Sequence, residues 1–395
     1  MNANLNVDQL KVVLDGFALD GTLLEITAFG TGHINNTYRS IYDEEGTKVR
    51  YTHQRINEQV FKHPEEVMDN IDRILAHLRA KILAARLSDP DRRCLRLIKG
   101  RTGKPWVRDH AGGYWRTYAF IEKSSTCEVL ESPRQAENIA RAVGRFQLML
   151  ADLGGKRLYE TIPNFHNTPE RYKSFHQVLE ADPVGRAASV RREIDWVLAN
   201  EERACAIAGA MASGSVPERI THNDTKANNI LLDEASGEAI CVIDLDTVMP
   251  GSLLFDFGDL VRTSTGTAAE DEADASRMEM RLPFFQPLAK GFIGETAAIL
   301  TSGERDLLPE AGRSITVEQA LRFLGDHIAG DTYYRIHRPG QNLDRARTQI
   351  ALVNSMDRQM DGIVRACHEA LPGVAAHETG ASGTIAGLAA RRDTV

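Results

Sequence analysis

The sequence predicts an α+β fold of two lobes, with a small β-rich N-terminal lobe and a larger, mainly helical C-terminal lobe. Its 395 residues, 42% of them hydrophobic, are long for a single compact core. Strand-like runs and glycine-containing turns dominate up to residue 122, whereas apolar residues at helical spacing dominate from residue 132 onward. We therefore expect one lobe over residues 1–122, a second over 123–371 and a flexible tail over 372–395.

The N-terminal lobe is predicted to begin with a helix and to continue into a β-hairpin. Apolar residues recur at helical spacing between residues 7 and 17. Two β-rich runs follow, joined by a Glu-Glu-Gly turn at 44–46. Pro64 then opens a helix with one apolar face, and strands alternate with glycine-containing turns up to Glu122. This order predicts a block of sheet plus helix.

The C-terminal lobe is predicted to combine helices with one hairpin. A Ser-Pro pair at 132–133 opens a first helix, and residues 193–212 carry apolar positions at helical intervals throughout. Between them, residues 160–172 are rich in turn formers and predict a loop. Apolar runs at 230–232 and 239–244 flank a polar turn, which predicts that they pair as a hairpin.

Composition and charge limit the classes of partner and compartment. The net charge of -8 argues against a general affinity for nucleic acid or an anionic membrane. The five cysteines include no C-x-x-C pair, so we expect ordinary reduced thiols. The N-terminal stretch lacks the pattern of a signal peptide, and no apolar run reaches the roughly 18 residues of a membrane helix. We therefore expect a cytoplasmic protein without nucleic-acid or membrane partners.

One segment carries a catalytic pattern. His222, Asp224 and Asn229 reproduce the H-x-D-x-x-x-x-N spacing of a kinase catalytic loop. The predicted hairpin brings Asn229 close to Asp244, and their oxygens suit Mg²⁺ together with phosphate and water. Asp224 is then free to orient and deprotonate a hydroxyl, while Lys226 neutralises charge on the transferred phosphoryl group. The pattern predicts phosphoryl transfer from a nucleotide to a hydroxyl acceptor.

The same residues also have a purely structural interpretation. Aspartate and asparagine are common in turns and caps, and Asp244 could simply end a strand. The joint occurrence of the loop spacing, the apolar run after it and Asp244 favours catalysis. His222 is expected to support the loop through hydrogen bonds, and Asp246 is either a second metal contact or a loop support.

Through these residues the chain resembles the aminoglycoside phosphotransferase/choline kinase superfamily, whose fold is similar to that of protein kinases. HND at 222–224 is similar to its catalytic motif, and IDLD at 243–246 to its metal-binding D-x-[DE] motif. LLFDFGDL at 253–260 is similar to a further segment, in which Asp256 would stabilise the catalytic loop. The resemblance implies a two-lobed, protein-kinase-like fold.

A closer resemblance is to the N-acetylhexosamine 1-kinases. It extends from about Phe29 to Gln349 and rests on HNDTKANN, IDLDTVMPGSLLFDFGD, IPNFHNTPERY, QRINEQVFKHPE and YYRIHRPGQNLDRARTQ. This resemblance implies that ATP and Mg²⁺ are used and that the acceptor is the anomeric hydroxyl of a small-molecule sugar, GlcNAc or GalNAc.

The expected phosphate loop departs from the protein-kinase pattern. Gly30, Thr31 and Gly32 are its candidate residues, but Asn35 replaces the third glycine. A turn at the entry of a strand would explain the same glycines. A Gly-Lys pair within residues 100–105 lacks the spacer and the Ser or Thr of a P-loop, and we expect a hairpin turn there.

The rest of the nucleotide site is expected in two places. One is the strand where protein kinases carry a phosphate-binding lysine, and the other is the hinge, the segment that connects the two lobes. The strand ends in Arg55, which is therefore the candidate, with Glu65 or Glu66 as its acidic partner. At the hinge, backbone groups from Phe120 to Glu122 are expected to bind adenine.

The acceptor is expected to contact Asp224 and a segment rich in polar and aromatic side chains. An amphipathic helix edge with surface charges would explain that segment equally well. Residues 165–169 are a second candidate wall. The candidate acceptor residues of the segment are Asp331, Tyr333, Tyr334 and Arg335.

Two other functions stay open. An aminoglycoside or choline-type kinase needs an acidic cleft for its cationic acceptor, and the acidic cluster at 270–274 would supply one unless it is a solvated loop. An inactive nucleotide-binding scaffold is disfavoured, because it has no need of Asp224, Asn229 and Asp244 together.

Overall fold

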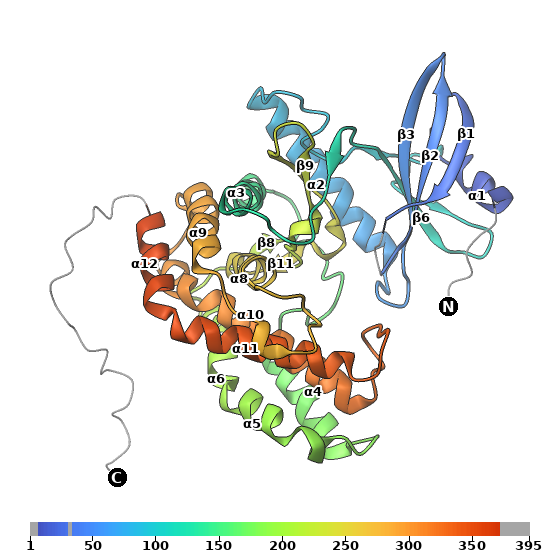
Figure 1. Ribbon diagram of the computed structural model, residues 1–395. Coiled ribbons are helices and arrows are strands. Elements are labelled where there is room, and N and C mark those ends of the chain that lie inside the picture. The colour runs from blue at the N-terminus through green and yellow to red at the C-terminus, as the bar shows by residue number, and fades with distance from the viewer. Residues whose placement is uncertain (1–6, 31–33, 372–395) are drawn as a thin grey trace, which may run out of the picture.

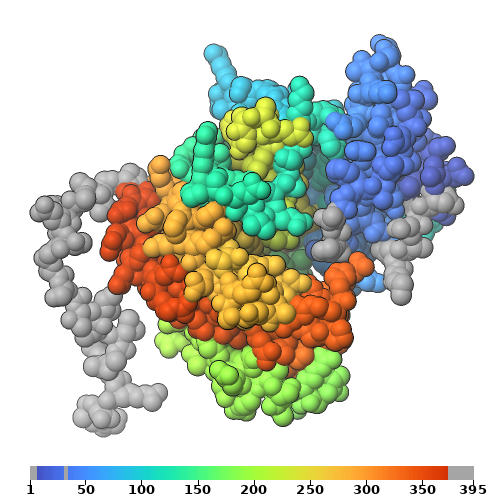
Figure 2. Space-filling view, in the orientation of Figure 1, coloured from blue at the N-terminus to red at the C-terminus, as the bar shows by residue number. Residues whose placement is uncertain are grey.

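The computed structural model describes residues 7–30 and 34–371, and these form a sheet-rich N-terminal lobe beside a larger helical body (Figure 1). The space-filling view shows the blue N-terminal lobe standing against that body (Figure 2). The predicted α+β class is confirmed. Thr31 and Gly32 of the candidate phosphate loop, and the expected tail over 372–395, lie outside the described residues.

A six-stranded antiparallel sheet forms the N-terminal lobe, in the order β1-β2-β3-β6-β4 with β5 also paired to β6. The predicted turn joins β2 to β3, where Gly46 has a positive φ of 86°. The register pairs Gln54 with Arg116 and Arg55 with Trp115, which decides the side chains that share a face. The strands are β1 (Thr22–Ala28), β2 (Asn36–Glu44), β3 (Thr47–Arg55), β4 (Leu97–Ile98), β5 (Val107–Arg108) and β6 (Tyr114–Ala119).

One helix packs on each face of this sheet. α1 (Val7–Leu14) is shorter than expected and ends just before Gly16, whose backbone freedom favours a turn over a further helical residue. α1 packs on a cluster that includes Trp115. α2 (Pro64–Ala84) begins at the predicted proline and packs between Tyr118 of the sheet and Leu245 of the C-terminal lobe. α2 therefore joins the core of the N-terminal lobe to the region of the candidate site.

The predicted hairpin is present as β9 (Ile230–Asp233) and β10 (Ala239–Val242), which pair antiparallel. The Ile243 N–H also donates to the Asn229 carbonyl at 2.9 Å, so the pairing extends to the candidate site residues. β7 (Ser124–Ser125) pairs with β9, and β8 (Arg219–Thr221) with β11 (Met249–Gly251). The expected boundary at residue 122 lies between the last strand of the large sheet and β7.

Two predictions for the C-terminal lobe differ from the structure. α3 (Pro133–Leu150) begins as predicted, and its cap Ser132 accepts from the Gln135 N–H. The single helix expected over 193–212 is instead α5 (Arg191–Ala199), α6 (Glu201–Ala204) and α7 (Ala206–Ala212). It breaks at Asn200, whose side chain donates to the Trp196 carbonyl at 2.8 Å. α4 (Thr168–Ala181) begins inside the predicted loop, because Asn167 caps it.

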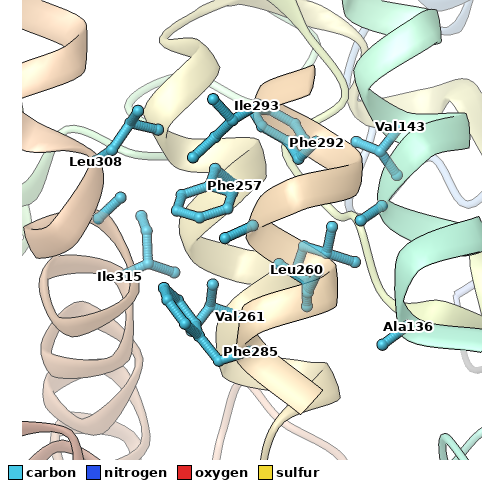
Figure 3. Close-up of a cluster of buried hydrophobic side chains, with 14 of the residues drawn as sticks. Ala136, Val143, Phe257, Leu260, Val261, Phe285, Phe292, Ile293, Leu308 and Ile315 are labelled. Carbon is cyan, nitrogen blue, oxygen red and sulfur yellow. The ribbon is translucent and has the colours of Figure 1, made fainter. Parts of the chain in front are cut away.

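The remaining helices enclose the main core, with α8 (Leu253–Ser264) at its centre (Figure 3). Side chains of α8 meet those of α3, α9 (Leu282–Thr296) and α10 (Ser302–Ala329). Every residue of α8 from Leu253 to Val261 is buried, Asp256 included. α11 (Gln341–Arg358) and α12 (Met360–Ala370) complete the lobe. Within the described residues, no helix combines the length and the apolarity that crossing a bilayer demands.

Candidate active site

The buried carboxylate of Asp256 holds the loop that follows β8. It accepts the backbone N–H groups of His222 at 2.9 Å and Asn223 at 2.6 Å, and a side-chain hydrogen bond from Gln147. Burial raises the pKa of Asp256, and these hydrogen bonds oppose that rise. Asn223 has a φ of 64°, so the loop turns sharply just before Asp224. These contacts are the ones that the predicted supporting role of Asp256 requires.

His222 links the loop to the strand that carries Asp244. Its Nε2 donates to the Ile243 carbonyl at 2.9 Å, and its Nδ1 accepts the Asp224 N–H at 3.3 Å. The ring also packs edge-on against Phe146. This arrangement is that of a residue that orients its neighbours, in line with the predicted supporting role.

Asp224 lies between two partners from its own loop. The Asn229 side-chain amide donates to the Asp224 carbonyl at 2.8 Å and to its carboxylate at 3.2 Å. Lys226 places its Nζ 3.2 Å from the same carboxylate oxygen. Burial acts to raise the pKa of Asp224, but the charges of Lys226 and His222 and a hydrogen bond from Lys226 together outweigh it and hold the pKa below its usual range. Asp224 is therefore a carboxylate at neutral pH.

Asp244 lies just beyond β10 and has a left-handed backbone, with φ and ψ both 59°. Its side chain is exposed to solvent even though protein surrounds it closely. Desolvation raises the pKa of Asp244 to about 6, and the charges of Asp246 and Asp224 reinforce the rise. Such a concentration of negative charge favours a bound cation.

Asn229 and Asp244 fit a magnesium ion as a pair of ligands. Because the amide nitrogen of Asn229 is used by Asp224, its side-chain oxygen is left as the available ligand atom. Across the described residues, no group of three or more His, Cys, Asp or Glu side chains could hold a metal by itself. Two protein oxygens completed by phosphate and water match the preference of Mg²⁺.

Asp246 has its partners in the N-terminal lobe. Both of its carboxylate oxygens accept from the guanidinium of Arg116, with Nη2 2.9 Å from Oδ2, and Asn35 donates to Oδ2 at 2.6 Å. Its oxygens are therefore occupied by protein donors. Of the two roles considered for Asp246, these contacts favour support.

The structure does not bring Arg55 to this site. Successive side chains of a strand point to opposite faces, and Arg55 shares its face with His53 and Trp115. Its Nε lies 3.2 Å from Asp109, whereas the expected partner Glu65 accepts from the Tyr114 hydroxyl. We therefore no longer assign a nucleotide contact to Arg55. The sequence showed a basic residue at the strand end but not the face on which it lies.

The hinge is partly occupied by protein contacts. The Phe120 N–H donates to the Arg50 carbonyl at 3.0 Å, and the Glu122 carbonyl accepts from Arg92 at 3.0 Å. The Glu122 carboxylate pairs with Arg50, whose guanidinium also lies 4.6 Å from the Phe120 ring. Within the described residues, the Phe120 carbonyl and the N–H groups of Ile121 and Glu122 have no protein partner and are left for adenine. Gly30 has a φ of 81°, and a Cβ built on it would meet no described residue within 4 Å.

The predicted acceptor residues divide into anchored and open ones. Asp331 is anchored, because its carboxylate accepts from Arg186 at 2.6 Å and Asn342 at 2.9 Å. The Tyr334 hydroxyl accepts from Gln319 at 3.1 Å. Tyr333 is 60% exposed, and Arg335 is exposed as well.

Sequence reasoning missed a buried polar group beside the catalytic loop. Glu318 of α10 is 1% exposed and lies 2.8 Å from His166, which also contacts the Asn223 carbonyl at 3.2 Å. One turn further along α10, the guanidinium of Arg322 lies over the rings of Phe165 and Tyr334, 5.4 and 5.6 Å from their centres. The helical i, i+4 spacing of Glu318 and Arg322 was the only signal in the sequence.

Comparison with known proteins places this geometry in a family. A family model described as "Phosphotransferase enzyme family" matches residues 25–287. Spectinomycin phosphotransferase, solved with ADP and spectinomycin, is 10% identical, with a TM-score of 0.55 over 91% of this chain and 100% of that one. An aminoglycoside phosphotransferase from Alicyclobacillus acidocaldarius is 15% identical, with a TM-score of 0.53 over 91% and 98%. Plasmodium vivax ethanolamine kinase is 14% identical, with a TM-score of 0.50 over 88% and 84%.

These structural likenesses concern the fold, and the family model spans most of the chain. The catalytic pattern at 222–229 and the hairpin that carries Asp244 both lie inside the matched residues. The chain thus belongs to the phosphotransferase enzyme family, the aminoglycoside phosphotransferase/choline kinase superfamily that its motifs resemble.

Proposed function

We propose that the protein is an ATP- and Mg²⁺-dependent kinase that phosphorylates the anomeric C1 hydroxyl of an N-acetylhexosamine, GlcNAc or GalNAc. The observation that carries the kinase proposal is the convergence of Asp224, Asn229 and Asp244 at the end of one hairpin. The choice of an N-acetylhexosamine as the acceptor rests on the resemblance of several long segments to the N-acetylhexosamine 1-kinases.

In this proposal Asp224 is the catalytic base. Its carboxylate is ionised and held in place by Asn229, so it can orient the acceptor hydroxyl and accept its proton as the oxygen attacks phosphorus. An anomeric hydroxyl is more acidic than an ordinary alcohol, which makes this proton easier to accept. Mg²⁺ held by Asn229 and Asp244 would neutralise charge on the nucleotide phosphates.

In this proposal Lys226 stabilises charge on the transferred phosphoryl group. It forms an ion pair with Asp224, whose charge is the main cause that raises the pKa of Lys226. A lysine kept protonated at this place can stabilise negative charge on the phosphoryl oxygens in the transition state. Because that transition state is loose, such electrostatic contacts supply most of the catalysis.

The charges on the acceptor side favour a neutral acceptor over a cationic one. Within the described residues, neither Arg171 nor Arg322 forms an ion pair with a carboxylate, and the Arg171 Nε is buried without a hydrogen-bond partner. The desolvated carboxylate of Glu318 already has His166 as its partner. The guanidinium of Arg322 beside the aromatic rings of Phe165 and Tyr334 suits the hydroxyl and acyl oxygens of a sugar, and it would repel an aminoglycoside or choline.

The acidic cluster at 270–274 is also a poor site for a cationic acceptor. Its side chains have partners inside the protein, which agrees with a structural origin for the charge run. These contacts are Glu270 with Arg262 at 2.6 Å, Asp271 with Gln341 at 2.7 Å, Glu272 with Arg277 at 2.8 Å and Asp274 with Ser276 at 2.6 Å.

An acceptor screen tests the proposal. ATP consumption is measured with GlcNAc, GalNAc, glucose, choline, ethanolamine and several aminoglycosides, with Asp224→Ala as the inactive control. We expect turnover with an N-acetylhexosamine and a product whose H1 proton couples to phosphorus in the NMR spectrum. Turnover with aminoglycosides or choline alone would replace the sugar with a cationic acceptor. ADP binding without turnover of any acceptor would favour the inactive scaffold.

A further inference from the structure

The β3 position that faces the C-terminal lobe holds Gln54, where a protein kinase would carry its phosphate-binding lysine. Strand alternation puts Thr52 and Gln54 on one face and His53 and Arg55 on the other. The register places Arg116 of β6 directly beside Gln54, and the Arg116 Nε donates to the Gln54 side-chain oxygen at 2.9 Å. The basic group on this face therefore comes from the neighbouring strand.

The guanidinium of Arg116 is buried but not saturated. The residue is 1% exposed, and its two terminal nitrogens bond to the carboxylate of Asp246. Together with the bond to Gln54, these contacts use three of the five N–H groups that a guanidinium carries. Among the described residues, one N–H on each terminal nitrogen has no acceptor and remains for another one.

The position of Arg116 relative to the rest of the site points to phosphate. Asp246 stands two residues beyond Asp244, the proposed metal ligand, and Asp244 acts electrostatically on Arg116. Asn35, which follows the candidate phosphate loop, donates to the same carboxylate at 2.6 Å. The Arg116–Asp246 pair thus lies between Asn35 and the metal motif, and the metal motif is one of the elements that contact nucleotide phosphates in kinases.

We propose that Arg116 is the cation of the N-terminal lobe that binds the nucleotide phosphates, with Asp246 as its counter-ion across the two lobes. The pair would replace the strand lysine and helix glutamate of protein kinases. Because the counter-ion comes from the metal-binding motif, the contact also holds the two lobes together at the phosphates. This inference rests on the proposed nucleotide-dependent function.

Two further arginines on this face have different surroundings. Arg50 pairs with Glu122 at the hinge, where adenine is expected. The guanidinium of Arg39 lies 5.4 Å from the ring of Phe29, toward the end of β1. Arg116 is the one of these three that contacts the metal motif.

Binding of ADP and adenosine, without Mg²⁺, separates a phosphate contact from a structural one. A buried Asp246 without its partner would destabilise the protein, so the double variant Arg116→Met/Asp246→Asn removes both charges together. By isothermal titration calorimetry we expect ADP affinity to fall about tenfold to hundredfold, because charged hydrogen bonds to phosphate are lost. Adenosine affinity is expected to stay unchanged, because adenosine has no phosphate.

Two further variants separate the effect of Arg116 from a general loss of positive charge. Arg116→Lys keeps the charge but loses the forked geometry, and we expect an intermediate loss of ADP affinity. Arg55→Met removes an arginine from the opposite face of the sheet and should leave the ratio of ADP to adenosine affinity unchanged. Equal losses for ADP and adenosine in the double variant, or an unchanged ADP affinity, would overturn the inference. Wild-type protein that binds adenosine and ADP equally would overturn it as well, and wild-type protein that binds neither would overturn the proposed function.

Discussion

The side-chain amide of Asn229 donates to both the backbone carbonyl and the carboxylate of Asp224, at 2.8 and 3.2 Å. One amide group thereby contacts the proposed base and contributes to the proposed metal site. Its nitrogen orients the base, and its oxygen is left for the metal that would hold the phosphates. A single side chain therefore positions the proposed base relative to the proposed metal site.

Removal of the Asp224 carboxylate should abolish base catalysis and spare the nucleotide. We expect Asp224→Ala to lower kcat by about 10²–10⁴ while ADP binding stays close to wild type. Steady-state kinetics and calorimetry on the same preparation measure the two effects. A variant that keeps near-wild-type kcat would show that Asp224 is not the base.

Metal activation should depend on pH through Asp244. The pKa of this carboxyl is raised to about 6 from an ordinary 3.8, so without metal it gains a proton as the pH falls through about 6. Mg²⁺ requires the carboxylate, so the Mg²⁺ concentration for half-maximal rate should rise between pH 7.5 and 5.5. Asp244→Asn should lower turnover and flatten this dependence. The same half-maximal Mg²⁺ concentration at both pH values in the wild-type enzyme would contradict the assignment.

Loss of Asp256 should weaken both the fold and the catalytic loop. Asp256→Ala leaves the buried N–H groups of His222 and Asn223 without an acceptor. Each unsatisfied donor costs about 1–3 kcal/mol, so we expect a clear drop in the free energy of unfolding along with kcat. Urea titration measures it, with exposed Asp361→Ala as the control expected to change stability by less than about 0.5 kcal/mol. Equal stability of the two variants would refute the supporting role.

Two glycines of α9 should respond to alanine in opposite ways. A Cβ on Gly291 would stand 2.5 Å from the Glu137 carbonyl of α3, whereas one on Gly294 would meet nothing within 4 Å. Gly291→Ala should therefore destabilise the protein by about 1–3 kcal/mol. Gly294→Ala should stabilise it by about 0.5–1 kcal/mol through its helix propensity. Thermal or urea unfolding of both variants tests the packing of α3 against α9, and equal effects would count against it.

Arg322 should affect the acceptor and not the nucleotide. Arg322→Met removes hydrogen-bond donors beside Phe165 and Tyr334, and we expect the acceptor KM to rise about tenfold to hundredfold. The KM for ATP should hardly change, because Arg322 lies on α10 of the C-terminal lobe. Exposed Arg358→Met is the control, with both KM values expected at the wild-type level. A rise confined to the KM for ATP would show that Arg322 acts on the nucleotide and not on the acceptor.

Prediction from sequence succeeded where the determinants are local. The hairpin that carries Asn229 and Asp244 is encoded by two apolar runs around a short turn, so its pairing could be read from the chain. The helix starts at Ser132 and Pro64 were predictable for the same reason, because caps and prolines act within one turn. The prediction of a single helix over 193–212 was wrong. Asn200 ends the first helix, although the apolar spacing continues past it.

The sequence by itself determined the fold class, the catalytic loop and the family, because these depend on residue spacings that hold along the chain. Only the tertiary structure decided the partners of the two arginines, since strand register and alternation place Arg55 beside Asp109 and Arg116 beside Asp246. It likewise decided that Asp331 is anchored and that Arg322 lies beside the rings of the acceptor side. The physical reason is common to these cases. Desolvation and charge pairing act between residues far apart in sequence, and no local pattern records their distance.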